Sequence, residues 1–116
     1  MPKLVKPRVL SDAALALIAA RFKVLSEVLR LKILIQLETG EKNVTELMRA
    51  TGASQANVSR QLQTLSEAGI VARRKAGQKA YYRICDPSVF DLCGHVCGSL
   101  QKHFEAQARM ARSLAH

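Results

Sequence analysis

The sequence predicts a mainly α-helical domain that contains one β-hairpin, and three observations support this fold class. Apolar residues recur at three- and four-residue intervals over residues 44–69, with a glycine between two groups, which fits two short helices and a tight turn. The spacing changes to partial alternation around a second glycine turn over residues 70–84, which is typical of a hairpin. Helical spacing precedes this region and returns after it, from residue 86 to about residue 110 or beyond.

Length, charge and cysteine content limit the classes of protein that the chain can be. A chain of 116 residues has room for one domain with a modest core. Eighteen Lys and Arg against nine Asp and Glu give a net charge of +9, which favours an anionic partner, most often nucleic acid. Because it has neither a membrane-length apolar run nor a signal peptide, we expect a cytoplasmic protein. Its three cysteines are then expected as free thiols or metal ligands.

The N-terminal third should contain two helices. Residues 1–10 hold three Lys or Arg and two prolines, so we expect a flexible basic arm there, with the folded domain over residues 11–116. The first helix should carry an apolar stripe that includes Leu15 and Ile18. The pattern over residues 24–37 is apolar around much of the helix circumference, which predicts the core helix on which the others pack.

Residues 44–69 are predicted to form a helix-turn-helix. Gly52 can adopt the left-handed conformation that ends the first helix, and Ser54 can cap the second. The second helix has outward-facing hydrogen-bonding side chains with few charges, which suit the base edges of a major groove. Taken alone, this segment could equally be a helix pair that touches no DNA. The predicted base-contacting residues are Ser54, Gln55, Asn57, Ser59, Arg60 and Gln61.

The predicted hairpin is strongly basic. It carries five Lys or Arg and no acidic residue. Exposed strand edges often carry Lys as protection against aggregation. However, five positive charges directly after a polar helix favour contacts with DNA phosphates. The predicted DNA-binding surface therefore also includes Arg73, Arg74, Lys75 and Lys79.

The last predicted helix has a narrow apolar stripe. At 100° per residue, residues of this stripe lie within about 60° of one another over four turns. Such a stripe is typical of a helix-pairing seam, and with the first helix it offers more apolar surface than one small domain can cover. We therefore expect a homodimer. The predicted interface residues are Leu15, Ile18, Val89, Cys93, Val96, Leu100 and Phe104.

The cysteines form a candidate site for a soft metal ion or metalloid. Cys93 and Cys97 lie one helical turn apart, and Cys85 precedes the helix as a possible third ligand. Thiolates suit As(III), Sb(III), Cd or Zn. The same thiols could instead take part in redox or reactive-sulfur chemistry, or pack as small apolar side chains. His95 and His103 are expected to be surface residues.

The order of elements is that of a winged helix flanked by a pair of dimerisation helices, and four stretches carry a family resemblance. Together they resemble the ArsR/SmtB family of winged-helix repressors over nearly the whole chain. The resemblance implies a homodimer that binds an inverted-repeat DNA operator and leaves it when an inducer, often a metal ion or metalloid, binds. The stretches are Leu25–Leu34, Ser54–Leu65, Ala68–Val71, and Arg73–Gly77 with Tyr81–Ile84.

Two metal sites of that family have no counterpart here. The stretch 42–47 lacks the cysteines that the family typically carries at the entry to its helix-turn-helix. In the last helix only Asp86 matches a family ligand, while Ser88, Ser99 and Lys102 replace the others. The three cysteines are thus left as the candidate inducer site. No motif predicts an enzyme, and the alternative from another class is a protein-interaction module whose basic hairpin docks an acidic partner and whose cysteines are structural.

Overall fold

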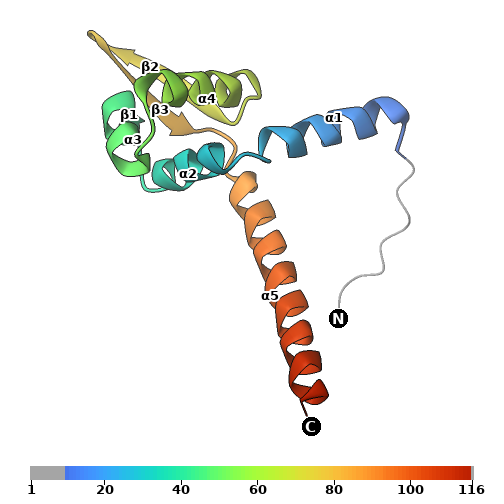
Figure 1. The fold of residues 1–116 in the computed structure, drawn as a ribbon. Coiled ribbons are helices and arrows are strands. Elements are labelled where there is room, and N and C mark those ends of the chain that lie inside the picture. The colour runs from blue at the N-terminus through green and yellow to red at the C-terminus, as the bar shows by residue number, and fades with distance from the viewer. Residues whose placement is uncertain (1–9, 116) are drawn as a thin grey trace. The chain divides into compact units, whose positions relative to one another are not determined.

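The computed structural model describes residues 10–115 (Figure 1). All but the last residue of the predicted basic arm, residues 1–10, lie outside the described part. The contacts divide the chain into two compact units, with the boundary in the sequence between Ile84 and Cys85. The elements are α1 (Asp12–Val24), α2 (Val28–Leu37), β1 (Lys42–Asn43), α3 (Val44–Thr51), α4 (Gln55–Glu67), β2 (Val71–Ala76), β3 (Lys79–Ile84) and α5 (Ser88–Leu114).

The core of the first unit lies between α2, α3, α4 and the strands. Burying each of its aliphatic side chains stabilises the fold by about 1.5–3 kcal/mol. The prediction that the second helix is the core helix is confirmed, since α2 packs against α3, α4 and β3. Not all of α2 is covered, because Val28 and Ile35 remain exposed. The largest fully buried side chains are Ile33, Leu34, Leu47, Leu62, Leu65, Ile70 and Val58.

Local hydrogen bonds fix the start of the helix-turn-helix and the turn between its two helices. A capping box begins α3, in which the Asn43 side chain accepts from the Glu46 backbone N–H and the Glu46 carboxylate accepts from the Asn43 N–H, both at 2.9 Å. The helix ends at Gly52, which has φ 75° and is left-handed as predicted. Ser54 caps α4 as predicted, because its Oγ accepts from the Asn57 N–H at 3.2 Å.

The predicted hairpin is confirmed as β2 and β3. Pairing of Ala76 with Lys79 leaves a two-residue turn, whose first residue, Gly77, has φ 62°. A third strand that the sequence did not predict, β1, pairs antiparallel with β3, so the strand order is β1-β3-β2. This strand joins the hairpin to the start of α3, because β1 ends at Asn43 and α3 begins at Val44.

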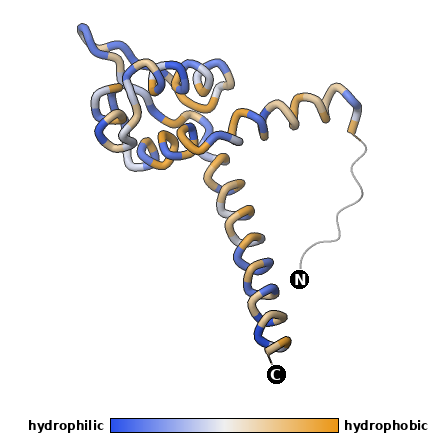
Figure 2. The backbone as a smooth tube through the Cα atoms, in the orientation of Figure 1, coloured by the Kyte–Doolittle hydropathy of each residue, from blue (hydrophilic) through white to orange (hydrophobic). Residues whose placement is uncertain are grey.

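The terminal helices leave much apolar surface uncovered. No residue of α1 is buried, and Val89 is the only buried residue of α5. Figure 2 shows hydrophobic residues recurring along both helices. Val89, which the sequence placed at the dimer interface, is only 3 % exposed, so it is largely covered within the single chain. Among the described residues, no helix is both long enough and apolar enough to span a bilayer.

Candidate nucleic-acid interface

Helix α4 has two chemically distinct faces. Val58, Leu62 and Leu65 bury one face in the core, which fixes the rotation of the helix about its axis. The opposite face therefore turns polar groups to solvent. Of the predicted base-contacting residues, Ser54, Gln55, Ser59 and Arg60 are exposed and Asn57 is partly exposed.

Gln61 does not belong to the exposed face, so the prediction that it faces outward is wrong. It follows Val58 by three residues and precedes Leu65 by four, which places it on the buried side of α4, and it is 6 % exposed. Its side-chain oxygen accepts from Arg30 Nη1 at 2.6 Å, and its Nε2 donates to Asn57 Oδ1 at 3.1 Å. Polar character alone suggested an outward position, and no local signal pointed to the partner 31 residues earlier.

The basic residues of the hairpin are all exposed, but one of them has an acidic partner. Arg74 donates from Nε and Nη2 to the two carboxylate oxygens of Glu41, both at 3.1 Å, and its guanidinium lies 5.1 Å from the centre of the Tyr81 ring. The hydrogen bond from Arg74 lowers the pKa of Glu41, and the same bond raises the pKa of Arg74. Arg73, Lys75 and Lys79 have no ion pair within the described residues.

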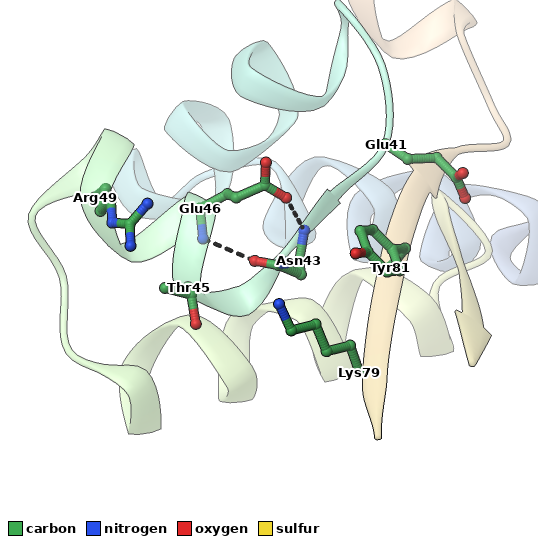
Figure 3. A pocket seen from close by; sticks show the side chains of 7 residues that line it. All are labelled: Glu41, Asn43, Thr45, Glu46, Arg49, Lys79 and Tyr81. Carbon is green, nitrogen blue, oxygen red and sulfur yellow. Dashed lines mark hydrogen bonds between the residues drawn. The ribbon is translucent and has the colours of Figure 1, made fainter. Parts of the chain in front are cut away.

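An open pocket of about 410 Å³ lies between α3 and β3 (Figure 3). Its two carboxylates are already engaged, because Glu46 closes the capping box and Glu41 binds Arg74. Its two cations, Arg49 and Lys79, have no ion pair within the described residues. The available charge of this pocket is therefore positive, which suits a phosphate oxygen better than a metal ion.

The three cysteines belong to the second unit, which begins at Cys85. Cys85, Cys93 and Cys97 are all exposed. Cys93 and Cys97 lie one turn apart on α5, as predicted. Residues 10–115 contain no group of three or more His, Cys, Asp or Glu that could hold a metal, so Cys85 is not brought to the other two as a third ligand within one chain. The pair can supply two thiolate ligands.

The helices α2, α3 and α4 followed by the β2–β3 hairpin define a winged helix-turn-helix domain, a class of DNA-binding domain. Residues 27–73 match the model of bacterial regulatory proteins of the arsR family. The chain is 37 % identical over 83 residues to the HTH-type transcriptional regulator NmtR of Mycobacterium tuberculosis, covering 72 % of this chain and 69 % of that protein. The chain therefore belongs to the ArsR family of transcriptional regulators, which are not enzymes.

Two solved structures agree with this fold along most of their length. The homodimeric winged helix-turn-helix DNA-binding domain Mb0332 of Mycobacterium bovis superposes with a TM-score of 0.69 at 35 % identity, covering 84 % of this chain and 93 % of that one. The antimony-specific transcriptional repressor AntR gives a TM-score of 0.76 at 29 % identity, covering 90 % and 96 %. The family resemblance and fold class inferred from the sequence are both confirmed.

Proposed function

We propose that this protein is a homodimeric repressor that binds an inverted-repeat operator, with α4 in the major groove and the β2–β3 hairpin along the backbone. The observation that carries the proposal is the two-faced packing of α4. Its apolar face is fixed in the core while Gln55, Ser59 and Arg60 are exposed. These side chains match the donors and acceptors of base edges, and the hairpin supplies charges for phosphates.

Exposed apolar residues on α1 and α5 support assembly as a dimer. Leu15 and Ile18 on α1 are 49 % and 41 % exposed, and Leu100 and Phe104 on α5 are 48 % and 60 % exposed. Side chains of this size stabilise a protein when they are removed from water. A twofold dimer places two copies of α4 in successive major grooves, which requires an inverted repeat. The relative Mb0332 is described as homodimeric, which supports a dimer here.

We further propose that a thiol-directed inducer releases the operator by binding Cys93 and Cys97. Both thiols are exposed, so a ligand can reach them. They also share the stripe that contains Leu100 and Phe104, so fixing the thiols in a new geometry would disturb the helix pairing. A coupling of about 1–3 kcal/mol is enough for release. As(III) and Sb(III) suit thiolates, as do Cd and Zn, and the relative AntR is described as antimony-specific.

Oxidation or reactive sulfur at the same thiols is the competing inducer chemistry. Residues one turn apart on a helix have Cβ atoms about 5–6 Å apart, whereas a disulfide needs about 3.5–4.5 Å. A Cys93–Cys97 disulfide would therefore distort α5, while a polysulfide bridge or a metalloid could span the longer distance. The longer distance between the two Cβ atoms favours a bridge through an additional sulfur or metalloid atom over a direct Cys93–Cys97 disulfide.

The test is an operator-release assay. A bound duplex is challenged with antimonite, arsenite, cadmium, zinc or polysulfide, using the wild type, the Cys93→Ser/Cys97→Ser variant and a Cys85→Ser control. We expect at least one reagent to release wild type and Cys85→Ser, and to leave the double variant bound. Release that persists in the double variant would contradict the proposed site.

A further inference from the structure

Building on the proposed DNA-binding function, we infer that Arg30 acts through Gln61 to set which group Asn57 presents to a base. Asn57 is thereby held as a hydrogen-bond donor that reads the keto oxygen of guanine or thymine. The usual two-pronged contact of an Asn with adenine is excluded. Arg30 and Gln61 are positioning residues in this scheme, and Asn57 is the residue that touches the base.

The inference starts from a chain of hydrogen bonds that crosses the first unit. Arg30 on α2 donates from Nε to the backbone oxygen of Val24 at 2.5 Å, and its Nη1 lies 3.1 Å from a carboxylate oxygen of Glu27. The same Nη1 donates to Gln61 Oε1 at 2.6 Å. Gln61 Nε2 then donates to Asn57 Oδ1 at 3.1 Å. The guanidinium is thus anchored at one end and reaches α4 at the other.

The direction of these bonds follows from the chemistry of Arg30. A guanidinium has five donors and no acceptor. Gln61 must therefore turn its oxygen toward Arg30, which leaves its amide nitrogen facing Asn57. Asn57 can meet that nitrogen only with its own oxygen. One donor-only group thus fixes the orientation of two amides in succession.

Burial makes this orientation costly to reverse. Gln61 is 6 % exposed and the Arg30 side chain is 13 % exposed, so water has little access to replace a lost bond. If Gln61 reversed, its NH₂ group would face the Arg30 donors, and its oxygen would face away from them. Buried polar groups left without a partner are strongly unfavourable in a low-dielectric interior.

The consequence for base recognition lies at Asn57. Its Oδ1 already accepts from Gln61 and, at 3.5 Å, from Arg60 Nη2. Its Nδ2 has no protein acceptor within the described residues, and the side chain is partly exposed in the first turn of α4. That turn contacts base edges in helix-turn-helix proteins. The two-pronged contact with adenine N6 and N7 needs both the oxygen and the nitrogen of an amide, whereas guanine O6 and thymine O4 need only a donor.

The decisive variant is Gln61→Glu. The new carboxylate still accepts from Arg30, but it has no donor for Asn57. Asn57 must then turn its Nδ2 inward and its Oδ1 outward, which favours the amino groups of adenine and cytosine. A matched control is Gln63→Glu, which adds the same charge to the exposed side of α4 and does not touch the chain of hydrogen bonds.

Each protein is used to select duplexes from a random double-stranded library. The position read by Asn57 is the one whose base preference disappears in Asn57→Ala. There we expect wild type and Gln63→Glu to prefer guanine or thymine by about 5-fold or more, and Gln61→Glu to prefer adenine or cytosine. Arg30→Lys, which keeps a donor-only group, should retain the wild-type preference, and Arg30→Met should lose it. Thermal unfolding of each variant confirms that it is folded.

Three outcomes would overturn the inference while leaving the proposed function intact. The first is an unchanged preference in a folded Gln61→Glu variant. The second is a wild-type protein that selects adenine at the Asn57-dependent position. The third is a selected sequence that does not depend on Asn57 at all. Failure of the proposed function looks different, because the wild-type protein would then select no sequence from the library.

Discussion

At the scale of single residues, the positive charge of the hairpin is not uniformly available to DNA. Arg74 shares its charge with Glu41 through two hydrogen bonds, whereas Arg73 has no ion pair within the described residues. A phosphate that approaches Arg74 must compete with a carboxylate already in place. The two neighbouring arginines should therefore contribute unequally to binding.

We expect Glu41→Gln to strengthen binding to any duplex and to make it more salt-dependent. Freeing Arg74 adds about one phosphate contact, so the slope of log K against log salt should steepen by about 0.9. Arg73→Ala should flatten the slope more than Arg74→Ala does. Fluorescence anisotropy at several salt concentrations measures both effects. A slope for Glu41→Gln equal to that of the wild type would mean that Arg74 does not reach the phosphates.

The same pair gives a pH dependence. Because Arg74 lowers the pKa of Glu41 from its usual value of 4.5, the pair stabilises the fold above that pH, and the contribution disappears as pH falls through the lowered pKa. The difference in unfolding free energy between wild type and Glu41→Gln should therefore narrow below pH 4.5. Urea unfolding between pH 3 and 7 measures this free-energy difference. A difference that widens in acid would contradict a stabilising Glu41–Arg74 pair.

At the scale of elements, α4 depends on its first turn for both stability and recognition. Ser54 caps the helix and is itself exposed beside Gln55. Apolar spacing and the Gly52–Ser54 turn were enough to predict this helix and its cap from the sequence. Short strand β1 was missed because its two residues, Lys42 and Asn43, carry no alternating pattern, and only pairing with β3 makes them a strand.

Substitutions at Ser54 should separate the two roles. Ser54→Ala should lower the unfolding free energy by about 1 kcal/mol, because an orphan N–H of the first turn loses its acceptor. Ser54→Asp should keep the cap and the stability but weaken DNA binding through repulsion of phosphates. Chemical denaturation and anisotropy on the same samples provide the two readouts. Equal DNA affinity for wild type and Ser54→Asp would place this turn away from the DNA.

At the scale of the whole molecule, the sequence predicted the elements that have a periodic residue pattern. It missed the contacts between residues that are far apart in the sequence. Spacing in the sequence indicated the core helix, the helix-turn-helix and the hairpin. The Glu41–Arg74 pair and the Arg30–Gln61 bond join residues 33 and 31 positions apart, and no local pattern encodes them. Val89 was placed on the helix-pairing seam by its angle alone, although it is covered within the chain.

Assembly provides a test at this scale. Leu100→Glu should convert the dimer to a monomer, because burying an unpaired charge in an apolar interface costs several kcal/mol. Lys102→Glu, which lies about 180° from Cys93, is the control that places a carboxylate on the opposite side of α5, and it should leave the dimer intact. Analytical ultracentrifugation at micromolar concentration distinguishes the two species. A wild-type protein that sediments as a monomer would exclude the proposed interface.

One titration tests directly whether this protein reads DNA sequence through α4. A duplex recovered by selection and a scrambled duplex of the same composition are each titrated at 150 mM salt, with wild type and a Gln55→Ala/Ser59→Ala variant. The wild type should bind the selected duplex at least about 10³-fold more tightly than the scrambled one, and the variant should lose much of that ratio. Equal affinity of the wild type for the two duplexes would contradict sequence recognition.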